Sequence, residues 1–302
     1  MSQVLLDVQR LRKHFPGRRS LLQGRSLAIE AVDDVSFSIA AGETLGLVGE
    51  SGSGKSTLGR TLLQLELPTA GRVLFDGEDI TGRPEPQLRV LRRRAQMIFQ
   101  DPIGSLDPRM LVGDIIAEPL DIHGLAPSRA QRRQRVEELL DLVRLPAEAA
   151  SRRPREFSGG QRQRIGIARA IAVNPDLIIA DEAVSALDVS IQAQIINLLL
   201  DLQARLRFAC LFIAHDLAVV RHIADRVAVM FMGRLVELGP SEALFADPRH
   251  PYTRALLDAA PIPDPVVEAA RVRSTTATAR RRYPVALTEV ASGHFVAASD
   301  PE

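Results

Sequence analysis

A glycine-rich segment behind a short apolar run most strongly limits what this chain can fold into. Residues 49–56 read Gly-Glu-Ser-Gly-Ser-Gly-Lys-Ser and fit the phosphate-loop pattern G-x-x-x-x-G-K-[ST]. The three glycines permit a tight turn whose backbone N–H groups point inward at a polyphosphate. Residues 44–48 before the loop have strand character, and the leucines after it have helical spacing. The sequence therefore predicts nucleotide binding, with Lys55 reaching the β- and γ-phosphates and the Ser56 hydroxyl binding Mg²⁺.

Composition narrows the class of protein. A chain of 302 residues that is 46% hydrophobic can bury one large domain plus an appendage. Its 38 Lys and Arg nearly balance its 37 Asp and Glu, which gives no support for a nucleic-acid partner. The single cysteine, Cys210, excludes a disulfide framework and a cysteine-based metal cluster. No apolar run approaches 18 residues, and Asp7 and Arg10 interrupt the N-terminal hydrophobics, so we expect a soluble cytoplasmic protein.

Polar residues follow three predicted buried strands. Gln100 follows the strand at 95–99, Asp181 and Glu182 follow the strand at 177–180, and His215 follows the strand at 209–214. Two acids at such a position are costly unless they meet a metal or water. In phosphate-loop enzymes the first acid usually holds Mg²⁺, and the second polarises the attacking water. A histidine at the same edge is placed to touch a γ-phosphate, and the Gln100 amide can face a metal or water.

Two further features leave alternatives open. Ser158 is a candidate N-cap, and the glycines after it leave backbone amides available at a helix N-terminus, which predicts a second anion site or simply a capped helix. Phe15 stands at the mouth of a basic loop, where its ring either stacks on a purine base or packs at a strand end.

The remaining pattern suggests inserted and appended parts. Strands are predicted at 4–11, 31–39 and 72–75, the last followed by a hairpin turn at Asp76-Gly77, and a strand pair is predicted at 226–232 and 234–238. Residues 101–157 are Pro-punctuated and helical, as in a subdomain inserted into the core. From Pro261 the Pro/Ala/Arg-rich tail is expected to be loosely ordered, with a small strand at 284–287.

Over roughly residues 1–260 the chain resembles the ATP-binding subunits of ABC transporters. Six family motifs occur in order: Walker A at 49–57, the Q-loop Gln100, the signature at 158–161, Walker B at 177–181 with Glu182, the D-loop at 185–188, and the switch His215. The resemblance implies an α/β fold: a P-loop NTPase ABC ATPase core with an antiparallel β subdomain and an inserted helical subdomain, about residues 101–165. Residues 261–302 would form the C-terminal tail.

Narrower features resemble the oligopeptide and dipeptide importers, also called the peptide/nickel branch. They are the Walker A sequence itself, Phe-Gln-Asp-Pro at 99–102, Ser-Leu-Asp-Pro at 105–108 and His-Pro-Tyr-Thr at 250–253. Phe157 stands where the family usually has Leu, and Ala183 stands where Pro commonly follows the glutamate, but neither change removes a chemical group. Many branch members carry a C-terminal cysteine cluster for an iron–sulfur centre. This tail has no cysteine, so we expect none here.

The resemblance also implies the site. ATP would be bound by Phe15 and by the Walker A residues Gly49, Glu50, Ser51, Gly52, Ser53, Gly54, Lys55, Ser56 and Thr57, while the signature residues Ser158, Gly159, Gly160 and Gln161 would serve the partner's nucleotide. Mg²⁺ would be held by Ser56, Gln100 and Asp181. Catalytic roles would fall to Glu182 as general base, to His215 at the γ-phosphate, and to Gln100.

The implied function is that of an ATPase subunit that energises uptake of oligopeptides or dipeptides from the cytoplasmic face of the membrane. The expected partners are two permease subunits, a paralogous ATPase or a second copy in a head-to-tail dimer, and, indirectly, an extracytoplasmic solute-binding protein. The alternatives are a soluble ABC ATPase outside transport, or an importer subunit for nickel or another small solute.

Overall fold

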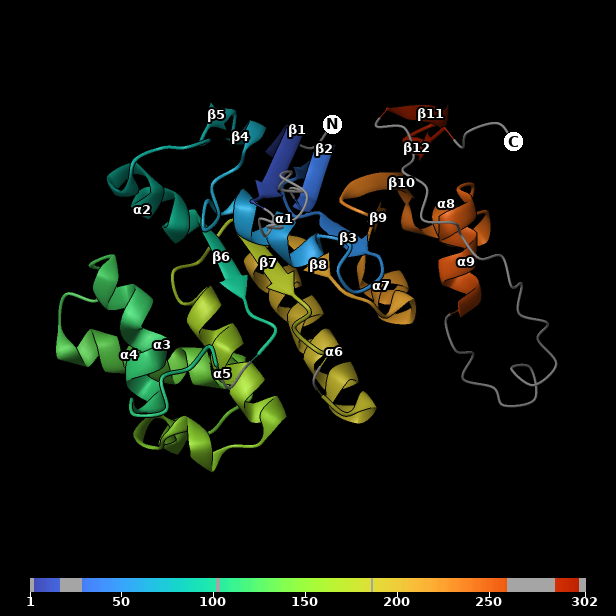
Figure 1. Cartoon of the computed structure of the whole chain (residues 1–302). Coiled ribbons are helices and arrows are strands. Elements are labelled where there is room, and N and C mark those ends of the chain that lie inside the picture. Colours follow the sequence, from blue (N-terminus) through green and yellow to red (C-terminus); the bar gives the residue numbers. More distant parts are fainter. Residues whose placement is uncertain (1–2, 17–28, 102–103, 186, 260–285, 299–302) are drawn as a thin grey trace, which may run out of the picture. The chain divides into compact units, whose positions relative to one another are not determined.

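The structure, a computed structural model, describes residues 3–16, 29–101, 104–185, 187–259 and 286–298 (Figure 1). The chain divides into two compact units. The first unit comprises residues 1–3, 40–43 and 83–213, and the second comprises residues 4–39, 44–82 and 214–302. Each unit is described by itself.

The first unit is built on three parallel strands in the order β8-β7-β6. Every residue of β7 and of β8 is buried, as near-continuous apolar runs are in parallel sheets. Ile98 is paired with Ala180 and Asp181 with Ile213, so the strands end at one edge. The elements are α2 (Glu85–Arg94), β6 (Ala95–Ile98), α3 (Val112–Ile122), α4 (Arg129–Leu142), 3-10 turns at Ala147–Ser151 and Pro154–Glu156, α5 (Gly159–Ile171), β7 (Leu177–Asp181), α6 (Val189–Leu206) and β8 (Ala209–Ile213).

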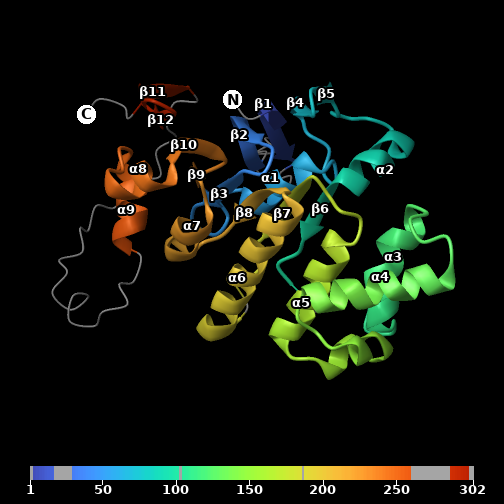
Figure 2. The ribbon, with the colours of Figure 1, turned by 180° about the vertical axis from the view of Figure 1, so that it is seen from behind.

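Three helices of this unit, α3, α4 and α5, pack together, as Figures 1 and 2 both show. Apolar side chains at helical spacing cause this: Ile115 and Ile116 on α3, and Val136, Leu139 and Leu140 on α4, are all buried. The arginines of α4 lie in different environments, and Arg132 pairs with Asp114 and Asp121 of α3. Arg133 pairs with Glu137 one turn later while its side chain stays 83% exposed, as expected for a solvated helix surface.

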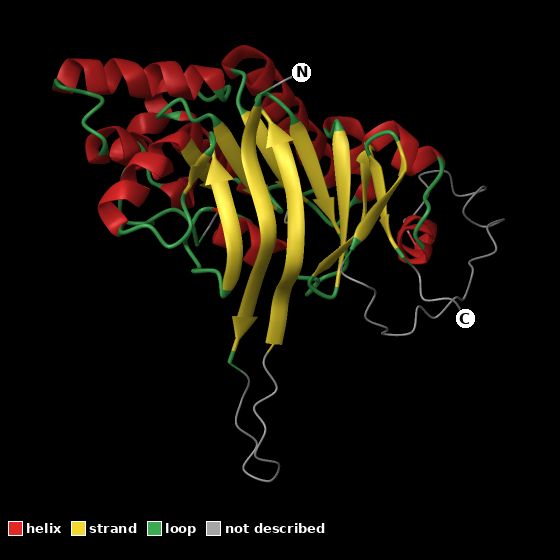
Figure 3. Cartoon of the chain, turned by 90° about the horizontal axis from the view of Figure 1, so that it is seen from above, coloured by secondary structure: helices red, strands yellow, loops and turns green. Residues whose placement is uncertain are grey.

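The second unit contains an antiparallel sheet in the order β2-β1-β4-β5 and a second group of strands in the order β11-β12-β10-β9-β3. Figure 3 shows β1 and β2 side by side. In the second group only β3 and β9 are parallel neighbours. The elements are β1 (Val4–Phe15), β2 (Ile29–Ala40), β3 (Thr44–Val48), α1 (Lys55–Leu62), β4 (Ala70–Phe75), β5 (Glu78–Asp79), α7 (Leu217–Ile223), β9 (Arg226–Phe231), β10 (Arg234–Pro240), α8 (Ser241–Ala246), α9 (Pro251–Ala259), β11 (Leu287–Ala291) and β12 (His294–Ala297).

The predicted α/β class with an antiparallel β part and a helical part is confirmed, and most predicted strands lie within two or three residues of their observed bounds. The turn at Asp76-Gly77 has positive φ at both residues (53° and 79°), as a tight hairpin turn of this sequence requires. The basic loop lies mostly outside the described residues. The first strand runs further than expected, to Phe15: β4 pairs with it as far as Arg12, and His14 N donates to Thr69 Oγ1 at 3.0 Å.

A small strand was expected in the tail at 284–287. The structure has a strand that begins at Leu287 and belongs to a hairpin, β11 and β12, which turns at Gly293. Residues 284 and 285 lie outside the described ranges. The hairpin forms because β10 offers a free edge, where Leu238 pairs with Phe295. That partner lies far away in sequence, so the local pattern could not predict it.

One glycine in the second unit is required by packing. A Cβ added at Gly46, in the middle of β3, would lie 2.4 Å from Val220 Cγ1 on α7 and 3.1 Å from Ala224 Cβ. In contrast, a Cβ at Gly166 in the interior of α5 would meet no atom within 4 Å. Gly166 can therefore serve as the control for a substitution at Gly46.

We expect Gly46→Ala to lower the free energy of unfolding by about 1–3 kcal/mol through overpacking. Gly166→Ala should raise it by about 0.5–1 kcal/mol, because alanine loses less backbone entropy in a helix. Urea unfolding followed by circular dichroism measures both. Equal effects of the two substitutions would contradict this account of β3 against α7.

Candidate functional site

The phosphate loop follows β3 in the second unit and leads into α1. Gly52 and Gly54 have φ of 80° and 106°, conformations that other residues rarely adopt, and Gly54 is the N-cap residue of α1. Lys55, only 4% exposed, folds back over the loop. Its Nζ donates to the carbonyl oxygens of Gly49 at 2.8 Å and Glu50 at 2.9 Å. The lysine therefore lies over the loop and is bonded to two of its carbonyl oxygens.

The phosphate loop packs against the backbones of β2 and β9. A Cβ at Gly49 would lie 2.1 Å from the carbonyl oxygen of Met230 on β9, and one at Gly54 would lie 1.9 Å from that of Ala31 on β2. The carbonyl of Ser53 accepts a hydrogen bond from Gly233 N at 2.9 Å. Gly49 and Gly54 are therefore required by packing against β9 and β2.

His215 and Phe15 also lie in the second unit. The residue before His215, Ala214, donates its N–H to the carbonyl of Leu47 on β3 at 3.1 Å. The residue after it, Asp216, caps α7 by accepting from Ala218 N at 2.8 Å. His215 itself is exposed, and hydrogen bonds hold the residues on both sides of it. It lies beside β3, the strand that leads into the phosphate loop. Phe15 ends β1, and Lys13 Nζ lies 4.8 Å from its ring centroid.

In the first unit the structure brings Gln100 and Glu182 together, as the strand-end argument predicts. Gln100 Nε2 donates to Glu182 Oε2 at 2.7 Å. A carboxylate only accepts hydrogen bonds, so the amide nitrogen of Gln100 must face it and the amide oxygen is directed elsewhere. Asp181, the last residue of β7, is 1% exposed.

Glu182 has an unusual backbone. Its φ is 46°, in the left-handed region that a residue with a side chain rarely adopts. Three hydrogen bonds keep it there. Its N–H donates to Ile213 O at 3.0 Å, and its carbonyl accepts from Ser185 N at 3.1 Å and Ser185 Oγ at 3.0 Å. Such a conformation persists only where the surroundings over-determine it, which is common at active sites.

The predicted signature residues begin α5 in the first unit. Ser158 Oγ accepts from Gln161 N at 3.3 Å, and Gln161 Oε1 accepts from Ser158 N at 3.0 Å, which together form a capping box. Ser158 is exposed. A Cβ at Gly160 would lie 2.5 Å from Ile191 Cγ2 on α6, so this glycine is also required by helix packing, a reason that its sequence position does not reveal.

One contact to the phosphate loop was missed. The backbone N–H of Glu50 donates to the hydroxyl of Tyr252, on α9, at 3.0 Å. From the sequence, Tyr252 was only part of a motif that marks a family branch. A signal was available, since tyrosine is rare in this chain, with two in all.

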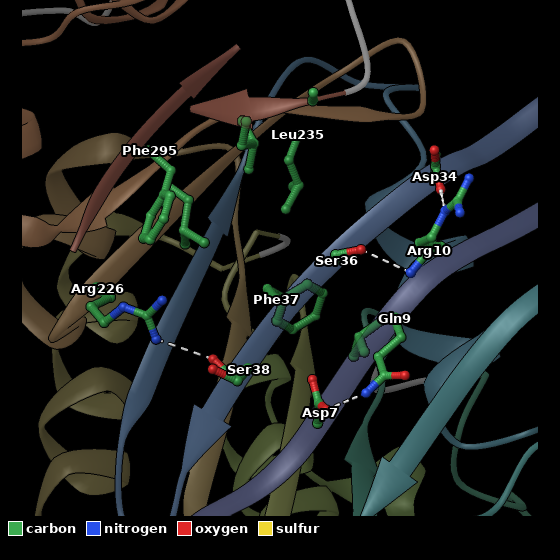
Figure 4. Close-up of a pocket in the computed structure, with 14 residues that line it drawn as sticks. Asp7, Gln9, Arg10, Asp34, Ser36, Phe37, Ser38, Arg226, Leu235 and Phe295 are labelled. Carbon is green, nitrogen blue, oxygen red and sulfur yellow. Dashed lines mark hydrogen bonds and ion pairs between the residues drawn. The ribbon is translucent and has the colours of Figure 1, made fainter. Parts of the chain in front are cut away.

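A pocket of about 780 Å³ lies elsewhere in the second unit (Figure 4). Residues of β1 and β2 line one part of it, and Leu235, Leu287 and Phe295 line another. Arg226 in its wall donates from Nη1 to Ser38 O at 3.1 Å. None of the residues expected to bind ATP belongs to its lining.

Two other features bear on chemistry. Burial raises the pKa of the Cys210 thiol, within β8, to about 12, so the thiol stays protonated and inert. Among the helices that the structure describes, none is long and apolar enough to cross a bilayer.

Residues 32–185 match the ABC transporter family, and residues 236–284 match the C-terminal region of oligopeptide/dipeptide transporters. The chain is 52% identical to the oligopeptide transport ATP-binding protein OppF of Bacillus subtilis (strain 168), over all of this chain and 98% of that protein. It is 58% identical to the probable peptide ABC transporter ATP-binding protein y4tS of Sinorhizobium fredii, over 88% of this chain and 75% of that one.

Solved structures agree with these matches. A dimeric structure of the ATP-binding cassette MJ0796, in a post-hydrolysis state with ADP and Pi, has a TM-score of 0.70 at 29% identity. The likeness covers 78% of this chain and 99% of that one. The motifs, their placement in the fold and the two family matches agree, and this chain belongs to the ABC transporter family of ATP-binding subunits.

Proposed function

We propose that this ABC ATPase energises the import of oligopeptides or dipeptides through permease subunits in the membrane. The observation that carries the proposal is the transporter-type C-terminal region at 236–284 joined to the ABC match at 32–185. Relatives named as oligopeptide and peptide transport proteins, similar over most of the chain, support the same substrate class.

The nucleotide would be held chiefly by the phosphate loop, Gly49–Thr57. Its backbone N–H groups and the start of α1 favour the triphosphate, and Lys55 would exchange its bonds to the loop carbonyls for bonds to phosphate oxygens. Phe15 would stack on the base at the end of β1. His215, exposed beside β3, would contact the γ-phosphate.

The proposed Mg²⁺ ligands are Ser56, Gln100 and Asp181. A hydroxyl, an amide oxygen and a carboxylate form an all-oxygen donor set of the kind that Mg²⁺ prefers. Asp181 ends β7 with 1% of its surface exposed, at the same strand edge as Glu182. When bound, the ion neutralises charge that develops on the phosphates.

Glu182 would act as the general base on the attacking water, with its carboxylate oriented by Gln100 and its backbone fixed by Ser185 and Ile213. Ser158–Gln161 would contact the nucleotide of a partner ATPase in a head-to-tail dimer, a second copy or, as we favour, a paralogue. ATP binding would then close the dimer and hydrolysis would reopen it.

The chain would lie at the cytoplasmic face of the membrane, with two permeases and, indirectly, a solute-binding protein as partners. We also propose that residues 1–260 form the ATPase domain, with the helical part at about 101–165 inserted, and that 261–302 form the tail.

Substitution of Glu182 tests its proposed role as the general base. Glu182→Gln should keep ATP affinity but lower the rate of phosphate release about 10²- to 10⁴-fold, because the amide cannot accept the water's proton. Glu137→Gln, at a partly exposed glutamate on α4 that pairs with Arg133, is the matched control and should hydrolyse ATP normally. Ordinary turnover by Glu182→Gln would remove Glu182 as the base.

Substitution of Ser158 tests whether it contacts the nucleotide of the partner ATPase. Ser158→Arg should leave ATP binding by the separate chain intact but abolish ATP-dependent association with the partner ATPase, because a long cation would fill the partner's phosphate site. Ser128→Arg removes a comparable serine cap from α4 and should associate normally. Size-exclusion chromatography with light scattering distinguishes the two, and association by both variants would refute the role of Ser158.

The transport function is tested by isolating the assembly. Membranes that contain the Glu182→Gln chain, solubilised with Mg²⁺ and ATP present, should yield two permeases, a related ATPase and a solute-binding protein that binds peptides. A binding protein that prefers nickel or another small solute would overturn the peptide assignment. Soluble partners alone would indicate an ATPase outside transport.

A further inference from the structure

We propose that Tyr252 is a positioning residue for the phosphate loop, and that the His-Pro-Tyr segment exists in this chain to hold it there. The inference rests on the proposed role of the loop in binding ATP. Its basis is a single peptide unit. The N–H of Glu50 donates to the Tyr252 hydroxyl at 3.0 Å, and the carbonyl of Gly49, in the same peptide plane, accepts from Lys55 Nζ at 2.8 Å.

Holding both ends of one peptide plane fixes its rotation. If the plane flipped, the Gly49 carbonyl would leave Lys55 and the Glu50 N–H would leave the hydroxyl. Lys55 alone restrains only the carbonyl end, and that restraint weakens when the ammonium turns to a phosphate. Tyr252 restrains the other end from outside the loop, so it keeps the loop in one conformation whether or not Lys55 contacts the carbonyl.

Tyr252 is itself buried and packed. Its side chain is 1% exposed, and its ring centroid lies 4.3 Å from that of Phe231 on β9, tilted by 42°. Burial raises the pKa of its phenol to about 12, so the hydroxyl stays neutral. A buried, packed hydroxyl loses little further entropy when it accepts a hydrogen bond.

A buried polar network fixes the start of α9 and thereby Tyr252. Tyr252 N donates to His250 Nδ1 at 3.1 Å. Burial lowers the pKa of His250 to about 4, which keeps the ring neutral and Nδ1 able to accept. The Glu237 carboxylate, 0% exposed on β10, accepts from the backbone N–H groups of Arg249 and His250, each at 2.9 Å.

The C-terminal hairpin supplies the last member of this network. His294 Nε2 on β12 lies 2.8 Å from Glu237 Oε1, and because a carboxylate accepts, the ring N–H donates. Three donors thus satisfy a carboxylate that would be costly to bury alone. The region that marks the peptide-transporter branch is in this way connected, bond by bond, to the loop expected to bind ATP.

The test is Tyr252→Phe in the full chain. It deletes one oxygen and keeps the ring on Phe231, so the melting temperature should stay close to wild type. The Kd for ADP with Mg²⁺, measured by isothermal titration calorimetry, should rise about fivefold, the effect of one hydrogen bond. In ATP hydrolysis KM should rise by a similar factor while kcat at saturating ATP stays nearly constant. A residue that only packs would leave KM unchanged.

The neighbouring residue provides a matched control. Thr253 is fully buried, and within the described residues its hydroxyl has no hydrogen-bond partner. Thr253→Val therefore deletes a buried hydroxyl one position away without touching the loop, and its Kd should equal that of wild type. If Tyr252→Phe also bound ADP as wild type does, the inference would be overturned.

A second control separates this failure from failure of the proposed function. Lys55→Ala should weaken ADP binding more than Tyr252→Phe does. If Lys55→Ala weakens binding and Tyr252→Phe does not, only the role of Tyr252 is wrong. If neither substitution changes the Kd, the phosphate loop is not the nucleotide site, and both proposals fall together.

Discussion

The phosphate loop lies directly against the backbone of two strands, and the second unit is arranged around that contact. Carbonyl oxygens of β2 and β9 stand where side chains of Gly49 and Gly54 would be, and the turn after β9 donates from Gly233 to Ser53. If the loop binds phosphate as proposed, this support would hold its backbone in one conformation before the anion arrives. A preorganised loop spends little binding energy on ordering itself, so β2 and β9 would matter to a site that they do not enter.

The same principle organises the first unit by different means. There the parallel register of β6, β7 and β8 brings the strand ends to one edge, and residues proposed to carry the chemistry lie just beyond that edge. Gln100 and Glu182 meet because Ile98 and Ala180 are paired two residues earlier. Each unit therefore fixes its own set of polar groups through strand pairing, so the positions of these groups depend on backbone geometry more than on flexible side chains.

The sequence predicted features whose cause is local. The phosphate loop, the strand ends and the cap at Ser158 follow from short patterns of glycine, apolar runs and N-cap residues, and the structure has them where expected. What it could not predict depends on partners far along the chain. Tyr252 contacts Glu50 across 202 residues, Gly160 is required by Ile191, and the hairpin at 287–297 forms on β10. No periodicity encodes such contacts.

The contact between Gln100 and Glu182 suggests why one glutamine can serve two proposed roles. An amide has a donor end and an acceptor end, and the carboxylate of Glu182 can engage only the donor. In the proposed mechanism the acceptor oxygen would then be left for Mg²⁺, so metal binding and orientation of the base would be linked through one side chain. Any movement that withdraws Gln100 would release both the ion and the base together. Gln100, exposed just beyond the end of β6, would be well placed for that linkage.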